Sequence, residues 1–170
     1  MNRLYVLIIL LNCIGYSQFT NATISDYPSN ATTDSIQTVI TKMLHAISSN
    51  DSIEAAKSVI REGRVMRVFN KDGNVNVSFR SNNTWIEQTG KRKINVHERM
   101  WSPIIFYRGD MAIAWTSYDF HIKNKFSHCG AEMFNLVRVN NQWLVSDWAY
   151  TVEPNNCEVS TLGPYVNKSK

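Results

Sequence analysis

The sequence predicts a domain of the α+β class, in which N-terminal helices pack on one side of a curved antiparallel β-sheet. Apolar residues recur at three- and four-residue steps between residues 35 and 48, which is the period of a helix. Residues 111–152 are instead rich in aromatic and β-branched side chains, and two short turns divide them into three strands. Helices that precede a block of hairpin-connected strands are typical of this class.

The first helix is predicted to begin at Ser35, with Asp34 as its N-cap residue. Its apolar stripe consists of Ile36, Val39, Ile40, Met43, Leu44 and Ile47. The polar residues 49–51 end this helix, and a shorter one follows over 53–61, before Gly63. The next elements in order are strands 64–70 and 74–79 around the turn Asp72-Gly73, a helix over 81–89 and a strand over 99–107.

Two turns set the pairing of the last strands, which with strand 99–107 form a predicted four-stranded antiparallel meander. Asn140-Asn141 is a two-residue turn that pairs Val139 with Gln142. Counting outward from that turn places Cys129 opposite Val152. A similar reversal about Asn124 places Phe120 opposite His128.

Strand alternation then divides these residues between two faces of the sheet. One face is predicted to carry Tyr118, Phe120, His128, Glu132, Phe134, Val145 and Asp147. The other is predicted to carry Trp115, Asp119, His121, Cys129, Met133, Trp148 and Tyr150. Both faces mix large apolar groups with ionisable ones, so we expect helices on one and a partner subunit or second layer on the other.

The start of the chain has the features of a secretory signal peptide, predicted over residues 1–17. A basic start at Arg3 precedes an apolar run over 4–14, and small residues lie three and one positions before a cut ahead of Gln18. The apolar run is shorter than the roughly 20 residues that a membrane-spanning helix needs. The sequence therefore predicts a secreted or periplasmic protein with no membrane span after leader removal.

A lipid anchor at Cys13 is the alternative, although Asn12 precedes it where a small residue is expected. Beyond the leader we predict a flexible polar lead-in over 18–33, one domain over 34–153 and a C-terminal tail over 154–170. The formal charge of +4 is dispersed, and the one basic cluster is 91–93, Lys-Arg-Lys. Nucleic-acid binders usually carry a continuous basic stripe, so we expect a solvated cluster, no nucleic-acid partner and no cofactor.

Cys129 and Cys157 are the two cysteines that remain after leader removal, in a compartment where disulfides persist. Because the chain can turn at Pro154 and bring Cys157 back toward Cys129, we predict one disulfide between them. A metal site at His121, His128 and Cys129 is the competing interpretation. One His-Cys dipeptide is weak support for it, because zinc sites need three or four convergent ligands.

The element order resembles the nuclear transport factor 2-like (NTF2-like) cone fold, which ketosteroid isomerase and scytalone dehydratase share with many non-catalytic domains. The resemblance covers roughly residues 35–152. A narrower pattern is similar to a group of exported bacterial NTF2-like proteins labelled lumazine-binding. It consists of Trp115, Tyr118, Phe120, the run Phe126-Ser127-His128-Cys129-Gly130, Phe134, Leu136, Val137, Trp143 and Cys157.

This resemblance implies a conical pocket between the helices and one sheet face, and a dimer through the other face. Relatives place polar pocket groups at positions that resemble Phe134 and Asp147. The implied ligand contacts are therefore Tyr118, Phe120, His128, Glu132, Phe134 and Asp147. Two carboxylates in one desolvated pocket would raise a pKa, which is the condition for a general acid or base.

Three interpretations of this face stay open. The preferred one is an exported domain that binds a small, partly apolar ligand in a cavity of roughly 300 Å³ or more. The second is an isomerase or dehydratase with Asp147 or Glu132 as general base and Tyr118 or His128 as proton donor. The third is structural, with an ion pair between Arg138 and the carboxylates, or with a cone filled by Trp and Phe side chains.

A homodimer is predicted on the outer face. Large apolar groups gather there on three adjacent strands, and the patch is too large to leave in water. It consists of Trp115, Met133, Trp148 and Tyr150. Asp119 and His121 on the same face are expected to be interface or surface groups.

Overall fold

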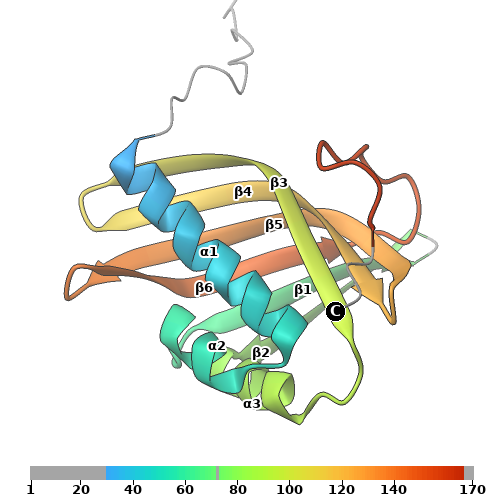
Figure 1. Ribbon diagram of the computed structural model, residues 1–170, viewed down its shortest axis with the longest axis horizontal. Helices are drawn as coiled ribbons and strands as arrows, with labels where there is room; N and C mark the ends of the chain where they lie inside the picture. Colours follow the sequence, from blue (N-terminus) through green and yellow to red (C-terminus); the bar gives the residue numbers. More distant parts are fainter. Residues whose placement is uncertain (1–29, 72, 167–170) are drawn as a thin grey trace, which may run out of the picture.

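A six-stranded sheet with the strand order β2-β1-β6-β5-β4-β3 frames the molecule in the computed structural model, which describes residues 30–71 and 73–166 (Figure 1). The helices are α1 (Ala31–Ser49), α2 (Ser52–Ser58) and α3 (Asn82–Lys91). The strands are β1 (Arg64–Lys71), β2 (Asn74–Ser81), β3 (Val96–Arg108), β4 (Met111–Ile122), β5 (Lys125–Val139) and β6 (Gln142–Val152). The predicted leader over 1–17, most of the lead-in and the last tail residues lie outside the described residues.

Helix α1 begins earlier than the sequence predicted. Asn30 is its N-cap: the side-chain oxygen accepts hydrogen bonds from the backbone N–H groups of Thr32 and Thr33, and Thr33 bonds back to Asn30. This reciprocal capping box satisfies N–H groups that Asp34 would have left open. Asp34 therefore lies in the first turn, where its charge favours the positive end of the helix dipole.

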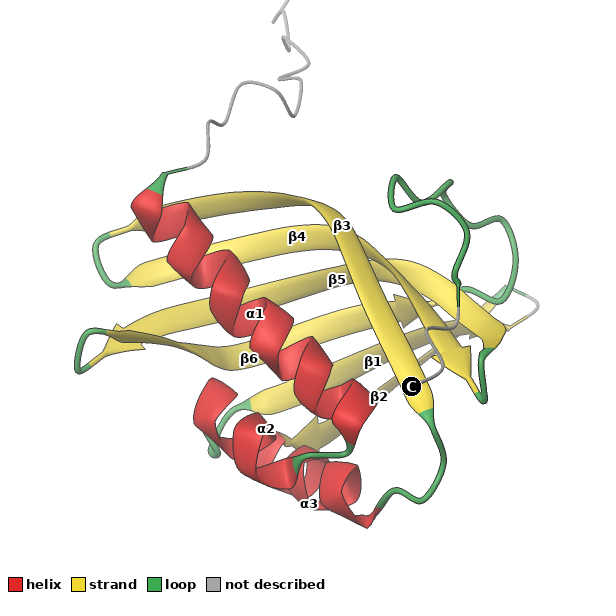
Figure 2. Cartoon of the chain, in the orientation of Figure 1, coloured by secondary structure: helices red, strands yellow, loops and turns green. Residues whose placement is uncertain are grey.

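All three helices lie on one side of the sheet (Figure 2). Helix α1 crosses it diagonally, and α2 and α3 lie beside β1 and β2 (Figure 2). The predicted stripe of α1 is confirmed as core, because Ile36, Ile40 and Met43 are fully buried against the sheet. Strand β3 bends around this core at Ser102, which has a left-handed backbone (φ 52°) before Pro103 and breaks the pairing with β4. The sheet is thereby curved over the helices.

The meander β3-β4-β5-β6 is antiparallel, as predicted. The sequence did not predict that β1 pairs with β6 in parallel, with Val65 opposite Trp148. This pairing places the early hairpin β1-β2 at one edge of the sheet. Within the described ranges, the helices are too short or too polar to cross a membrane.

The predicted turn pairs are confirmed near the turns but not along the whole strands. Val139 pairs with Gln142 and Phe120 with His128. A bulge then inserts Ser146 into β6, between the pairs Leu136–Val145 and Asn135–Asp147. Every residue beyond it changes face, because side chains alternate along a strand.

This bulge corrects the predicted faces of β6. Trp148 and Tyr150 lie on the helix side, where Trp148 stacks on Phe134 at a centroid distance of 6.0 Å. Asp147 lies on the outer face instead. The predicted partner of Cys129 also shifts by one residue, from Val152 to Glu153.

Candidate functional site

A cavity of about 200 Å³ opens on the helix side of the sheet, and we call it the cone cavity. Every strand contributes to its lining, together with α1 and α3. The lining residues are Ile47, Arg67, Arg80, Trp85, Arg92, Glu98, Phe120, His128, Trp148, Tyr150 and Val152. Most of these residues are aromatic or arginine. The volume of the cavity is smaller than the roughly 300 Å³ expected of a ligand pocket.

Five of the six predicted contact residues lie on the cavity side of the sheet. Phe120 and His128 line the cavity directly. Tyr118, Glu132 and Phe134 are fully buried on the same face. The sixth, Asp147, is on the other face.

Tyr118 is held as a structural residue. Its hydroxyl donates a hydrogen bond to the carbonyl oxygen of Thr151. Its ring lies over Gly130, where an added Cβ would be 2.9 Å from a ring carbon. Burial raises the pKa of Tyr118, with smaller contributions from Glu98 and Glu132. A phenol with a satisfied hydroxyl and a raised pKa is a poor proton donor.

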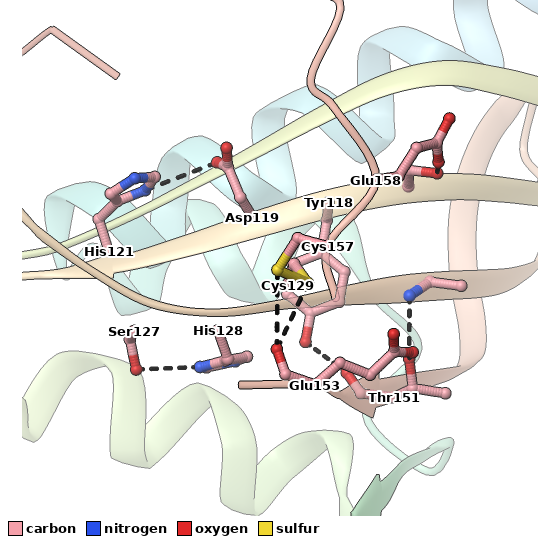
Figure 3. Close-up of a disulfide and its surroundings, with 12 residues drawn as sticks. Tyr118, Asp119, His121, Ser127, His128, Cys129, Thr151, Glu153, Cys157 and Glu158 are labelled. Carbon is pink, nitrogen blue, oxygen red and sulfur yellow. Dashed lines mark hydrogen bonds and ion pairs between the residues drawn. A yellow bond between two sulfur atoms is a disulfide. The ribbon is translucent and has the colours of Figure 1, made fainter. Parts of the chain in front are cut away.

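His128 is a neutral ring in an aromatic stack. It packs face to face on Phe120 at 5.0 Å between centroids, and its Nδ1 lies 3.0 Å from the hydroxyl of Ser127 (Figure 3). Burial, and secondly the charge of Arg67, lowers the pKa of His128 to about 4. The imidazole therefore contributes hydrogen-bonding capacity and a flat surface, but no charge, at neutral pH.

Glu132 is the most unusual residue of the site. Its exposed fraction is 0%, and within the described part of the chain neither carboxyl oxygen has a hydrogen-bond partner. Burial, and secondly the nearby Glu98, raises the pKa of Glu132 well above its ordinary value. Burial therefore favours the neutral carboxylic acid, which can donate one hydrogen bond and accept others.

Glu98 is a second acidic group, which the sequence did not reveal. It points into the cone cavity from β3, and its backbone N–H faces the hydroxyl of Ser48. Burial raises the pKa of Glu98 to about 8, although Arg92 and Arg80 oppose the shift. The alternation Val96, Glu98, Met100 was the signal that could have found it, but the predicted strand began three residues too late, at Arg99, and so left Glu98 out.

Three arginines were also missed. Arg92 belongs to the cluster predicted to be solvated, yet it reaches inward and donates to the carbonyl oxygen of Ile47 at 2.9 Å. This bond caps the C-terminal end of α1. Arg67 and Arg80 enter the cavity from β1 and β2.

Asp147 and Arg138 are both excluded from the cone cavity. Asp147 accepts a hydrogen bond from the backbone N–H of Arg64 at 3.0 Å, at the start of β1. Arg138 pairs with Asp110 at 2.7 Å near the β3-β4 turn, so the predicted ion pair with Glu132 is absent among the described residues. Of the two acidic groups on this side of the sheet, Glu98 lines the cavity, and Glu132 is fully buried near it.

The C-terminal tail covers one end of the outer face, where a disulfide joins Cys129 to Cys157 (Figure 3). Farther along the tail, Tyr165 stacks on His121 at 4.1 Å between centroids, beside the ion pair of Arg99 with Asp119. The disulfide is compatible with a secreted or periplasmic protein.

The alternative metal site is excluded by two observations. Cys129 is used in the disulfide. His121 lies under the tail on the outer face, whereas His128 lines the cone cavity on the inner face. The two histidines therefore cannot bind one ion.

The rest of the outer face is apolar and exposed. Met111, Ile113 and Trp115 are 69%, 47% and 51% exposed on β4. The predicted patch is thus corrected: Trp115 and Met133 belong to it, and Trp148 and Tyr150 do not.

No family model matches the chain, and no curated protein matches it. Solved structures do. A protein of unknown function with a cystatin-like fold from Nostoc punctiforme is 9% identical, with a TM-score of 0.59, over 75% of this chain and 96% of that one. An NTF2-like protein from Cytophaga hutchinsonii is 16% identical, with a TM-score of 0.58, over 73% of this chain and 99% of that one.

An NTF2-like superfamily protein from Salmonella enterica is also 16% identical, with a TM-score of 0.57, over 75% of this chain and 94% of that one. Likeness at this identity shows the fold and not the activity. The narrower resemblance to the lumazine-binding group stays a prediction. The chain has the NTF2-like fold, with helices and a curved sheet enclosing a cone.

Proposed function

We propose that the protein binds a small, partly apolar molecule in the cone cavity. One observation carries this proposal: the buried carboxyl group of Glu132 has no partner among the described residues. Burying such a group costs roughly 1–3 kcal/mol. Glu132 is not one of the lining residues, so a ligand offsets this cost where it reaches past the lining to hydrogen-bond this carboxyl group.

A second unpaired group supports the same conclusion. The indole Nε1 of Trp148 is buried without a hydrogen-bond partner in the described part of the chain. Trp148 also lines the cavity, and Trp85 meets its ring edge-on at 5.5 Å. The cavity thus offers aromatic walls with a few unpaired polar groups, as small-molecule sites do. Its volume of about 200 Å³ suits a molecule of one ring.

An isomerase or dehydratase is the second candidate, and the observation that favours it is the pKa of Glu98, raised to about 8. A carboxyl group that titrates near neutral pH can act as a general acid or base. Asp147 is outside the cavity and cannot serve there. Burial also raises the pKa of Glu132 well above its ordinary value, which favours a role as proton donor rather than as base.

Export and dimerisation complete the proposal. A leader over 1–17 would deliver the domain to an oxidising compartment, which the disulfide requires. The exposed apolar residues of β4 would be covered by a second copy of the chain.

Native mass spectrometry of the protein purified from its source tests ligand binding. We expect a co-purifying small molecule in the wild type, its loss in Glu132→Leu, and its retention in the matched outer-face control Asp147→Asn. A wild-type protein that carries no small molecule, and retains none from an extract of its source, would count against the proposal.

A further inference from the structure

The mouth of the cone cavity carries two cations on one face of one hairpin. In the register of β1 and β2, Arg67 lies opposite Ser78 and Arg80 lies opposite Val65. Arg67 and Arg80 are therefore diagonal neighbours, and side chains at such positions can reach the same point. Both line the cavity.

Neither arginine forms an ion pair within the described part of the chain. Across residues 30–71 and 73–166, no carboxylate lies within ion-pair distance of Arg67 or Arg80. Arg80 donates to the neutral amide of Gln88 at 2.9 Å, and Arg67 lies over the ring of Phe69 at 5.0 Å. Arg99, by contrast, has Asp119 as its partner.

The walls behind these cations are flat and apolar. Phe120 and His128 stack on one another, and Trp148 stacks on Tyr150 at 5.6 Å between centroids. Such walls suit a planar ring, because stacked and edge-on aromatic contacts are favourable. Guanidinium groups at the mouth suit an oxyanion, which they bind with paired, charge-assisted hydrogen bonds.

The acidic residues restrict the charge of that oxyanion. Glu98 lines the same cavity, and Glu132 lies on the same face. The ionised fraction of Glu98 would repel a dianion such as a phosphate monoester about twice as strongly as it repels a monoanion. A carboxylate has a single charge and a planar shape that fits two guanidinium groups.

We infer that the ligand of the cone cavity is a small aromatic acid of one ring, with its carboxylate between Arg67 and Arg80. This inference rests on the proposed function, since it names the chemical class for the same cavity. The ring would lie among Phe120, His128 and Trp148.

Calorimetric titration with three probes of one ring tests the inference: benzoate, neutral benzamide and phenyl phosphate. We expect benzoate to bind about tenfold or more tightly than either of the others. Benzamide lacks the charge that strengthens the hydrogen bonds to the arginines, and phenyl phosphate adds repulsion from Glu98. Arg67→Gln and Arg80→Gln should each weaken benzoate binding about tenfold or more. Arg64→Gln is the matched control, because Arg64 lies on the same strand and is exposed on the opposite face.

The possible failures are distinguishable. The claim that the ligand is an anion would be wrong if benzamide bound as tightly as benzoate, or if Arg67→Gln and Arg80→Gln kept wild-type affinity for benzoate. Either result would leave the proposed function standing. Tighter binding of phenyl phosphate would overturn the carboxylate class. If none of the probes binds, the inference is wrong, and a co-purifying neutral molecule would still support the proposed function. Thermal unfolding of each variant separates lost binding from lost folding.

Discussion

At the scale of single residues, the buried carboxyl group of Glu132 is expected to favour ligand binding and to lower the stability of the ligand-free protein. Because it is buried without a partner among the described residues, Glu132→Leu should raise the free energy of unfolding of the ligand-free protein by about 1–3 kcal/mol. Glu132→Gln keeps the polar character and should change it by less than about 1 kcal/mol. Urea unfolding of both variants measures this. A Leu variant less stable than the wild type would mean that Glu132 has a structural partner.

Glu98 should make stability depend on pH. Its folded pKa of about 8 lies above the ordinary 4.5, so the folded state keeps a proton that the unfolded chain loses, and stability falls as pH rises between these values. His128, with a pKa lowered from 6.5 to about 4, acts oppositely, but only below pH 6.5. Between pH 6.5 and pH 8 the loss of stability caused by Glu98 should therefore dominate.

Glu98→Gln should lessen that fall by about 1–2 kcal/mol. The urea midpoint at pH 6.5 and pH 8 measures it, and Glu62→Gln, at an exposed position before β1, is the control. An unchanged pH dependence in Glu98→Gln would assign the effect to Glu132 or to another group.

Residue-level prediction from the sequence succeeded where alternation alone decides the face. Phe120, His128, Glu132 and Phe134 precede the bulge in β6 and lie where they were expected. Arg92 was missed because a run of three basic residues normally indicates a solvated surface, and the carbonyl oxygen that it caps belongs to a helix some 45 residues earlier. Local sequence contains no sign of that contact.

At the scale of elements, the bulge at Ser146 decides which residues of β6 reach the cavity. Its carbonyl oxygen accepts a hydrogen bond from the side-chain amide of Asn82 at 2.9 Å. Gly63 lies against the same oxygen, where an added Cβ would be only 1.6 Å away. The bulge is thus held by segments far away in the sequence. The turn fixed the hairpin register locally, whereas the bulge could not be predicted from the strand itself.

Gly63→Ala should therefore be severely destabilising, by about 3 kcal/mol or more, because backbone must move to admit the methyl group. Gly90→Ala in α3 is the matched control, since its Cβ would meet only the side chain of Ser52. Thermal unfolding compares the two variants. Equal melting temperatures would show that the contact between Gly63 and Ser146 relaxes without cost.

The disulfide fixes the tail to β5. It closes a loop with a sequence separation of 28 residues, so Cys157→Ser should lower the free energy of unfolding by about 3 kcal/mol. Urea unfolding of Cys157→Ser and of the wild type with reductant should give similar values. Reductant added to Cys157→Ser should change nothing further. A variant as stable as the oxidised wild type would mean that the tail stays in place through Tyr165 and Arg99 alone.

At the scale of the whole molecule, the two faces of the sheet differ in how far they are covered. The helices cover one, and the tail covers part of the other. What remains exposed on the described outer face is centred on Ile113 and Trp115. A protein in solution rarely leaves such a patch uncovered.

We expect light scattering at micromolar concentration to report a homodimer. Trp115→Glu should convert it to a monomer, because a charge would be buried in the interface. Ile53→Glu, which changes a more exposed apolar residue on α2, should leave the dimer intact. A wild-type monomer would show that the tail already covers enough of the outer face.

The parallel pairing of β1 with β6 also has a consequence for how the chain folds. The hairpins of the meander close through short turns, but Val65 can meet Trp148 only after nearly the whole chain has been synthesised. Contacts between distant segments form slowly, because a long loop must close first. Until then the facing edges of β1 and β6 present unpaired backbone groups to any other strand nearby. The last strand to be made is thus the one that protects the first from aggregation.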